Sequence, residues 1–229
     1  MNLQNQVNDE ILKLIDWLRS NRLSLNVKKT NIMIFGKIKE ATKKDIKIDI
    51  EGQTLEVVYK TKFLGLILDD QLCWKQHLLY LAQKTAKSIG ILSLARQVLS
   101  HTTLIQLYYS FIFPYLNYCN LAWGGASEKN LWIIYRIQKM AFRLVLNVRK
   151  GQSTLKKCKE FILLRLPEIH AHSIAIFMYK YTNGMLPGIF DKKKYCNKEC
   201  HNYNTRNANK LRTPLARTTL ASKFIKKRV

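Results

Sequence analysis

The chain has 229 residues, of which 47% are hydrophobic, and its 39 lysines and arginines outnumber 15 aspartates and glutamates to give a formal charge of +24. This hydrophobic content excludes a wholly disordered chain, and the length suits one domain, or a small domain followed by a larger one. The charge predicts a polyanionic partner, and nucleic acid fits better than a small acidic substrate because its phosphates repeat along a strand; an anionic membrane surface is the runner-up.

The first seventy residues predict one helix and a small antiparallel sheet. A cap at Asn8-Asp9-Glu10 precedes apolar residues around Trp17, and the helix is expected to end near Asn21-Arg22. Charged residues alternate with isoleucines from Asp45 to Ile50, which indicates a strand buried on one face, and Glu51-Gly52-Gln53 supplies a turn into the next strand. The expected strands are residues 31–35, 45–50, 54–59 and 63–68.

After Trp74 the pattern changes to helices. A long helix from Leu78 to Ala95 contains Gly90, which weakens it by about 1 kcal/mol relative to alanine. A second helix starts near Thr102 or Thr103 and is kinked by Pro114. Further helices are expected to begin at Ser127-Glu128, at Ser153-Thr154 and at Glu168 or Ile169, and the last of these ends at Asn183-Gly184.

The helix that begins at Ser127 places apolar and basic residues on neighbouring arcs. The apolar arc is expected to pack inward and consists of Ile133, Ile134, Ile137, Met140, Ala141, Leu144 and Val145. The basic arc consists of Arg136, Lys139, Arg143 and Lys150. Two interpretations stay open for the basic arc: it follows a phosphate backbone, or it is merely a solvated basic face.

The predicted fold class is α+β and mostly α-helical. Residues 1–73 form a helix and a small sheet, and residues 74–190 form a helical region. Residues 191–229 have little apolar periodicity and three consecutive lysines, so we expect a loosely ordered basic tail that a partner could order.

Two motifs carry a family resemblance. The first, from Trp17 to Phe35, reads W-x3-N-x-L-x-L-N-x2-K-T-x-x-M-x-F, and the second, from Phe63 to His77, reads F-L-G-x-x-x-D-x-x-L-x-W-x2-H. Their sequence, order and separation resemble the reverse transcriptases of non-LTR retrotransposons, in the jockey and CR1-like group. Near the end, Tyr203-Asn204-Thr205-Arg206 is also similar to the tail of such elements.

The resemblance implies a polymerase palm remnant followed by a thumb. The first motif corresponds to the fourth palm motif, whose lysine matches Lys29 and is thought to donate a proton to the leaving pyrophosphate. The second corresponds to the strand hairpin that contacts the primer end, which makes Phe63, Leu64 and Gly65 candidate nucleic-acid-binding residues together with the basic arc. The alternatives are a surface lysine at Lys29 and a sheet core at Phe63 and Leu64. Gly65 alone is also typical of a bulge.

The family's catalytic aspartates would precede Met1. Phosphoryl transfer needs two metal ions held by converging carboxylates, and here Asp69-Asp70 falls at the hairpin turn while Asp45 and Asp49 alternate with lysine. We therefore predict no catalytic residues and no metal or cofactor in this chain, with Mg²⁺ implied for the full-length enzyme. The implied partners are an RNA template with a DNA primer, and the upstream palm and fingers of the same polyprotein.

A zinc site is the other metal hypothesis. Cys196-x3-Cys200 has a permitted spacing, but His201 directly follows Cys200, which strains joint ligation, and His170 and His172 fall on a predicted helix. We predict no zinc. No motif for a serine or cysteine nucleophile and no glycine-rich phosphate loop is found.

The cysteine pattern and the N-terminus predict an intracellular protein, in the nucleus or cytoplasm. The five scattered cysteines are odd in number, and Met1 leads into polar residues without the pattern of a signal peptide. The most apolar window, Leu104 to Trp123, is interrupted by polar residues and Pro114, so a buried, kinked helix is favoured over a membrane span. The alternative function is an independent basic helical module that binds RNA or DNA.

Overall fold

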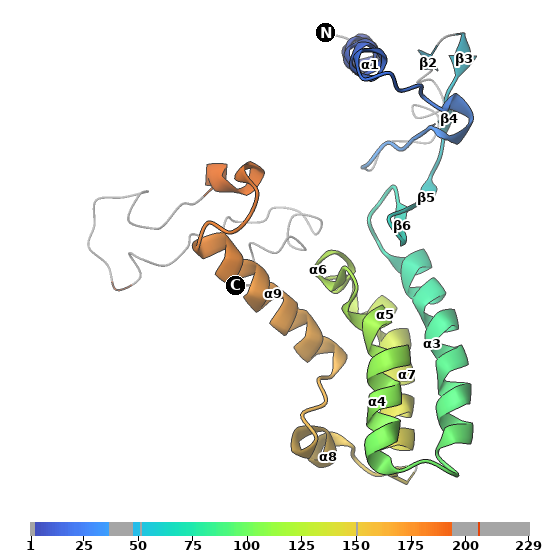
Figure 1. The fold of residues 1–229 in the computed structure, drawn as a ribbon, viewed down its shortest axis with the longest axis vertical. Coiled ribbons are helices and arrows are strands. Elements are labelled where there is room, and N and C mark those ends of the chain that lie inside the picture. The colour runs from blue at the N-terminus through green and yellow to red at the C-terminus, as the bar shows by residue number, and fades with distance from the viewer. Residues whose placement is uncertain (1–2, 37–47, 51, 150, 194–205, 207–229) are drawn as a thin grey trace. The chain divides into compact units, whose positions relative to one another are not determined.

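The computed structural model describes residues 3–36, 48–50, 52–149, 151–193 and 206. The chain divides into two compact units, Met1–His77 and Leu78–Val229. The described residues are mostly helical with small sheets, which confirms the α+β class (Figure 1). The predicted basic tail lies outside the described residues, apart from residues 191–193 and 206, and so does Lys150.

The described residues of the first unit form three two-stranded sheets in place of one antiparallel sheet. Strand β2 (Asp49–Ile50) pairs antiparallel with β3 (Gln53–Thr54), which confirms the predicted hairpin in shorter form. Strand β1 (Asn31–Ile32) pairs parallel with β4 (Glu56–Val57), so the prediction of a purely antiparallel sheet is wrong. A parallel pair needs a long connection, and the chain between β1 and β4 supplies one.

Helix α1 (Leu3–Ser20) covers the apolar cluster of this unit, starting several residues before the predicted cap. Ile48, Ile50 and Leu55 are buried, so the predicted isoleucine face is confirmed for the described part of that strand. Partly buried hydrophobic residues pack against these three. They come from α1, from the segment that contains the short 3₁₀ helix η1 (Val27–Lys29), and from β1: Val7, Ile11, Ile15, Leu25, Val27 and Ile32.

The apolar run at 63–68 is a hairpin turn and not one continuous strand. Strand β5 (Lys60–Phe63) pairs antiparallel with β6 (Leu66–Asp69), and Phe63 faces Leu66 across the turn. The two turn residues, Leu64 and Gly65, have φ values of +45° and +81°. Positive φ at both central residues is typical of a type I′ turn, and an apolar run does not reveal such a turn by its periodicity.

The described part of the second unit is helical. Most of α3 (Lys75–Ala95) belongs to it, and α4 (His101–Phe111) begins after Ser100, whose hydroxyl accepts a hydrogen bond from the Thr103 backbone at 3.3 Å. Near Pro114 the helix is broken and not merely kinked, because α5 (Phe113–Asn117) is a separate element. The remaining elements are α6 (Asn120–Trp123), α7 (Glu128–Val145), α8 (Leu155–Glu160), α9 (Leu166–Thr182) and the 3₁₀ helix η2 (Gly188–Lys193).

Helices α3, α4 and α7 run alongside one another (Figure 1), and α9 packs on α5, α6 and α7. A buried amide joins three of these elements. The Gln138 side chain of α7 donates to the Tyr108 hydroxyl and to the Leu164 carbonyl at 3.0 Å each, and it accepts from the Leu166 backbone at 2.8 Å. Burial raises the pKa of Tyr108. The first turn of α9 is thereby fixed to α7.

Within the described ranges, every helix is too short or too polar to cross a lipid bilayer.

Candidate nucleic-acid interface

The tip of the β5–β6 hairpin exposes apolar side chains. Phe63 is 59% exposed and Leu64 is 73% exposed, so the alternative that they form a sheet core is wrong. Gly65 is the second central residue of the turn, where a positive φ favours glycine. The tip therefore presents two apolar side chains next to a position without a side chain.

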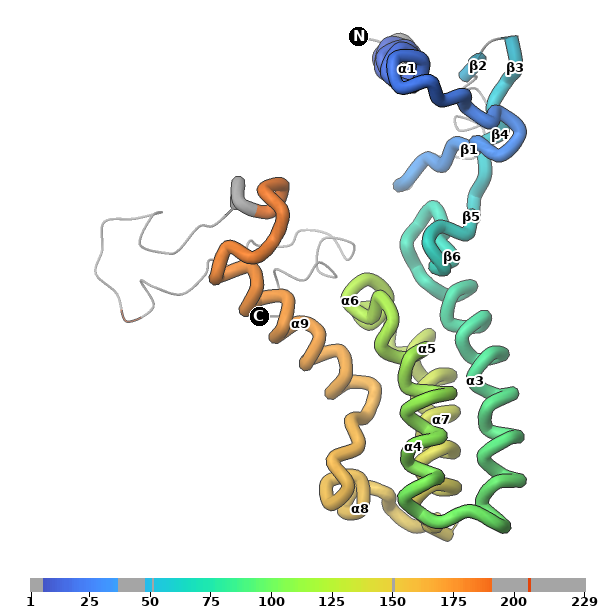
Figure 2. The backbone as a smooth tube through the Cα atoms, viewed as in Figure 1, coloured from blue at the N-terminus to red at the C-terminus, as the bar shows by residue number. Residues whose placement is uncertain are grey.

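The base of this hairpin is fixed by Asp69. Its side chain is buried, and its two carboxylate oxygens accept hydrogen bonds from the Cys73 and Trp74 backbones, each at 2.8 Å. Asp69 is thus neither a solvated turn residue nor a free metal ligand. It holds the bend that leads from β6 into α3 (Figure 2).

Trp74 and His77 complete the support of the hairpin. Both side chains are buried, and their rings lie edge to face with centroids 6.1 Å apart. The His77 Nδ1 atom accepts a hydrogen bond from the Ile67 backbone at 3.3 Å, and burial lowers the pKa of His77 to about 4. The spaced aspartate, tryptophan and histidine of the second motif therefore attach the hairpin to the start of α3.

The two sequence motifs meet in the first unit. The Gly36 backbone donates to the Asp70 carbonyl at 3.2 Å, and the Val58 backbone donates to the Ile32 carbonyl at 2.8 Å. Lys29 lies at the end of η1 with its side chain exposed, and its backbone nitrogen donates to the Asn26 side chain at 3.2 Å. The segment after Lys29 is thus hydrogen-bonded to the base of the hairpin.

In the second unit, α7 presents cations on its outer face. Arg136 is exposed, and Lys139 and Arg143 are partly exposed, in agreement with the predicted basic arc. Lys129 lies on the same face, so we define the basic face of α7 as Lys129, Arg136, Lys139 and Arg143. Arg143 also donates to the Gln152 carbonyl at 3.5 Å.

The apolar arc of α7 is rotated from its predicted position. Met140, which was expected inside, is 51% exposed, and Gln138, which was not expected inside, is 1% exposed. The buried residues of the helix are Ile134, Gln138, Ala141, Phe142 and Val145. The buried face of α7 therefore includes Gln138 and Phe142. The Gln138 amide can be buried because it forms hydrogen bonds there.

Sequence reasoning missed Trp132, which is 58% exposed on α7 within the basic face. Its ring stacks on that of Tyr135, with centroids 5.6 Å apart and an interplanar angle of 29°. Its spacing from the basic arc was a usable signal, because Trp132 precedes Arg136 by four residues and therefore lies on the same face.

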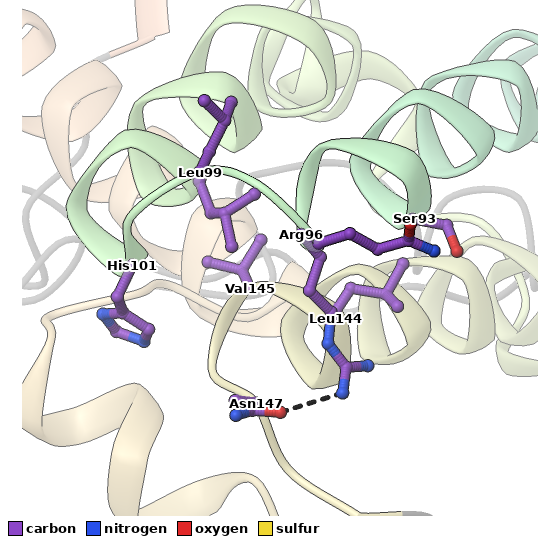
Figure 3. Close-up of a pocket in the computed structure, with 9 residues that line it drawn as sticks. Ser93, Arg96, Leu99, His101, Leu144, Val145 and Asn147 are labelled. Carbon is purple, nitrogen blue, oxygen red and sulfur yellow. Dashed lines mark hydrogen bonds between the residues drawn. The ribbon is translucent and has the colours of Figure 1, made fainter.

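A pocket of about 580 Å³ lies where the end of α3, the start of α4 and the end of α7 meet (Figure 3). Arg96 crosses it and donates to the Asn147 side chain at 2.9 Å. The His101 ring, at another wall, lies against Phe161 with centroids 4.7 Å apart. Among the residues that the structure describes, no carboxylate lines this pocket, so its charge favours an anion.

A larger groove of about 880 Å³ lies between α7 and α9. Trp132 and Tyr135 line it from α7, and Pro167, Ala171 and Ala175 line it from α9. The groove is mainly apolar, and Glu128 is the carboxylate in its lining.

The described residues offer little support for a metal site. His170 is buried, with its Nδ1 atom 2.9 Å from the Asn120 side-chain oxygen, whereas His172 is exposed on another side of α9. Asp49 accepts a hydrogen bond from Thr54. Asp45 and the pattern Cys196, Cys200 and His201 lie outside the described residues. In the part of the chain that the structure describes, no three His, Cys, Asp or Glu side chains converge on one point.

The chain matches no protein-family model, no curated protein and no solved structure in the three comparisons made with known proteins.

Proposed function

We propose that this chain is the C-terminal part of an RNA-directed DNA polymerase of a non-LTR retrotransposon, and that it binds template–primer nucleic acid without extending the primer by itself. In this proposal the first unit is the end of the palm and the second unit is the thumb. The observation that carries the proposal is the exposed tip of the β5–β6 hairpin, at the place where the resemblance expects contact with the primer.

The hairpin tip suits contact with a nucleic-acid backbone. Each large apolar side chain left in water forgoes about 1.5–3 kcal/mol of burial, so an exposed pair such as Phe63 and Leu64 favours a contact surface. Gly65 allows a sugar–phosphate chain to come close because it carries no side chain. The hydrogen bonds of Asp69 and the packing of Trp74 fix the base of this hairpin at the bend into α3.

The basic face of α7 suits the phosphates of the same ligand. Lys129 and Arg143 are fourteen positions apart, which corresponds to about 21 Å along a helix. Phosphates of a duplex strand recur every 3.4 Å or so along the axis, so this face spans about six base pairs. Glu128 is the acid nearest to it in sequence, and it occupies the first turn of α7, where the helix dipole favours a negative charge.

The carboxylates of the described residues do not fit the two-metal centre of a polymerase. Both oxygens of Asp69 are occupied by backbone N–H groups. In the proposal, Mg²⁺ and the catalytic aspartates belong to upstream residues of the same polyprotein, and Lys29 acts only beside them. No step of primer extension is assigned to this chain.

An independent RNA- or DNA-binding module is the second candidate. It is favoured by the location of the basic face and both cavities within the second unit, Leu78–Val229, without any contribution from the hairpin. This function needs no polymerase partner.

One binding experiment separates the two candidates. The full chain is titrated against an RNA–DNA template–primer junction and against a blunt duplex of equal length, as wild type and as the variant Phe63→Ala/Leu64→Ala. The polymerase proposal expects the variant to lose about tenfold in affinity for the junction and little for the blunt duplex. Equal affinities of variant and wild type for both ligands would favour the independent module.

A further inference from the structure

We infer that the groove between α7 and α9 binds an unpaired nucleobase of a single strand, with Trp132 as the stacking surface and the basic face of α7 on the flanking phosphates. This inference rests on the proposed nucleic-acid function and adds a preference for single-stranded segments. Four observations carry it: the exposure of Trp132, the shape of the groove, its apolar walls and the charges around it.

Trp132 has an exposed indole, in contrast to the other tryptophan nearby in the sequence. Trp123, in the same unit, is fully buried and its indole N–H donates to the Tyr118 carbonyl at 2.9 Å. Trp132 instead keeps more than half of its surface in water while it stacks on Tyr135. An aromatic ring that is fixed on one side and open on the other is the arrangement that proteins use to stack bases of any sequence.

The wall of the groove that α9 forms consists of small apolar side chains. Pro167, Ala171 and Ala175 follow one another at intervals of four residues on α9, and therefore form one ridge of small side chains. Gly124 permits the end of α6 to approach α9, because a Cβ atom there would lie 2.3 Å from the His170 Nδ1 atom. The volume of about 880 Å³ is within the usual range of small-molecule sites. A flat aromatic group fits between such walls.

The charges select a nucleic acid over an apolar peptide or a lipid chain. Lys129 precedes Trp132 by three residues, and Arg136 and Lys139 follow it by four and seven, so cations flank the indole on one helix face. A base that stacks on Trp132 has a phosphate on each side, and each phosphate meets a cation. An uncharged partner would leave these cations without a counterpart.

The test compares single-stranded and duplex ligands. A labelled single-stranded RNA 12-mer and the corresponding blunt duplex are each titrated with the full chain. The proteins compared are the wild type, Trp132→Ala, Trp132→Phe and a control, Trp17→Ala. The control removes an indole of similar exposure (57%) from α1. Trp132→Ala is expected to weaken single-strand binding about 5- to 100-fold and duplex binding less than about twofold. Trp132→Phe restores most of the loss, and Trp17→Ala changes neither affinity.

Other results overturn the inference. An unchanged ratio of single-strand to duplex affinity in Trp132→Ala rejects the stacking role while leaving the proposed function intact. Absence of binding to either ligand by the wild-type chain rejects both. A concentration-dependent dimer that Trp132→Ala dissociates identifies a second copy of the chain as the occupant. Thermal unfolding of the variants accompanies the titrations, and their midpoints are expected to match the wild type because Trp132 is exposed.

Discussion

At the scale of single residues, Gln138 has the largest structural role relative to what its residue type suggests. Its amide makes three hydrogen bonds, two of them buried and one partly buried, that join α4, α7 and the start of α9. Replacing it by leucine leaves the Leu166 N–H and the Leu164 carbonyl without this partner, so Gln138→Leu is expected to lower the free energy of unfolding by about 2–4 kcal/mol. Urea unfolding measures the loss. Gln106→Leu, on the exposed side of α4, is the control and should change stability by less than about 0.5 kcal/mol.

His77 gives the stability a dependence on pH. Burial lowers its pKa from 6.5 to about 4 in the folded chain, so the unfolded chain binds more protons between these values. Stability contributed by neutral His77 is complete above pH 6.5 and declines as the pH falls toward 4, by at most about 3 kcal/mol. Unfolding titrations from pH 7.5 to 4 measure it. His77→Asn, which keeps an acceptor but cannot titrate, should show a flatter profile; identical profiles would contradict the assignment.

The residue scale also shows the limits of sequence reasoning. The cations of α7 were placed correctly, because charged side chains rarely lie in a core. Met140 was expected inside and is exposed, whereas Gln138 was not expected inside and is buried. Hydrophobicity alone does not reveal that the Gln138 amide forms three hydrogen bonds to segments distant in sequence. The buried states of Asp69 and His77 were not predicted for the same reason: each depends on a contact across a turn.

At the scale of elements, two glycines in or next to helices differ in whether the surrounding structure can accept a side chain. In α3, a Cβ atom at Gly90 would meet no atom within 4 Å, so Gly90→Ala should stabilise the chain by up to about 1 kcal/mol. At the end of α6, a Cβ atom at Gly124 would lie 2.6 Å from the Asn120 carbonyl, so Gly124→Ala should destabilise it by at least about 1 kcal/mol. Thermal unfolding of the pair checks both signs, and a shift of both in the same direction would contradict the packing.

Helix positions were largely predictable, and strand connections were not. The helices at 75–95, 128–145 and 166–182 were expected within a few residues, because local spacing and capping residues determine them. The turn at Leu64-Gly65 was hidden within an apolar run. The hairpin turn was expected at Asp69-Asp70, which is wrong because Asp69 is the last residue of β6. The parallel pairing of β1 with β4 depends on residues far apart in sequence, which periodicity does not record.

At the scale of the whole molecule, charge dominates. The described part of the second unit carries cations on α7 and Arg96 in the smaller pocket, while its acids are Glu128, Glu160, Glu168 and Asp191. Glu168 forms an ion pair with Arg165, which lowers the pKa of Glu168. The charge of Glu168 therefore offsets little of the positive potential elsewhere on the unit. Such a surface is expected to hold a polyanion by the release of its counterions.

The variant Arg136→Gln/Lys139→Gln/Arg143→Gln tests which cations take part. Each phosphate contact contributes about 0.9 to the slope of log affinity against log salt on duplex DNA, so the variant should lose up to about 2.7 in slope. Its thermal midpoint should stay close to that of the wild type, because these residues lie off the buried face. An unchanged slope would place the phosphates on another surface.

A salt titration of the wild-type chain with a template–primer duplex addresses the central claim most directly. If about six phosphates are neutralised, the logarithm of the affinity should fall against the logarithm of the salt concentration with a slope near −5. Affinity that stays constant as salt rises, or binding to anionic vesicles but not to the duplex, would contradict the account.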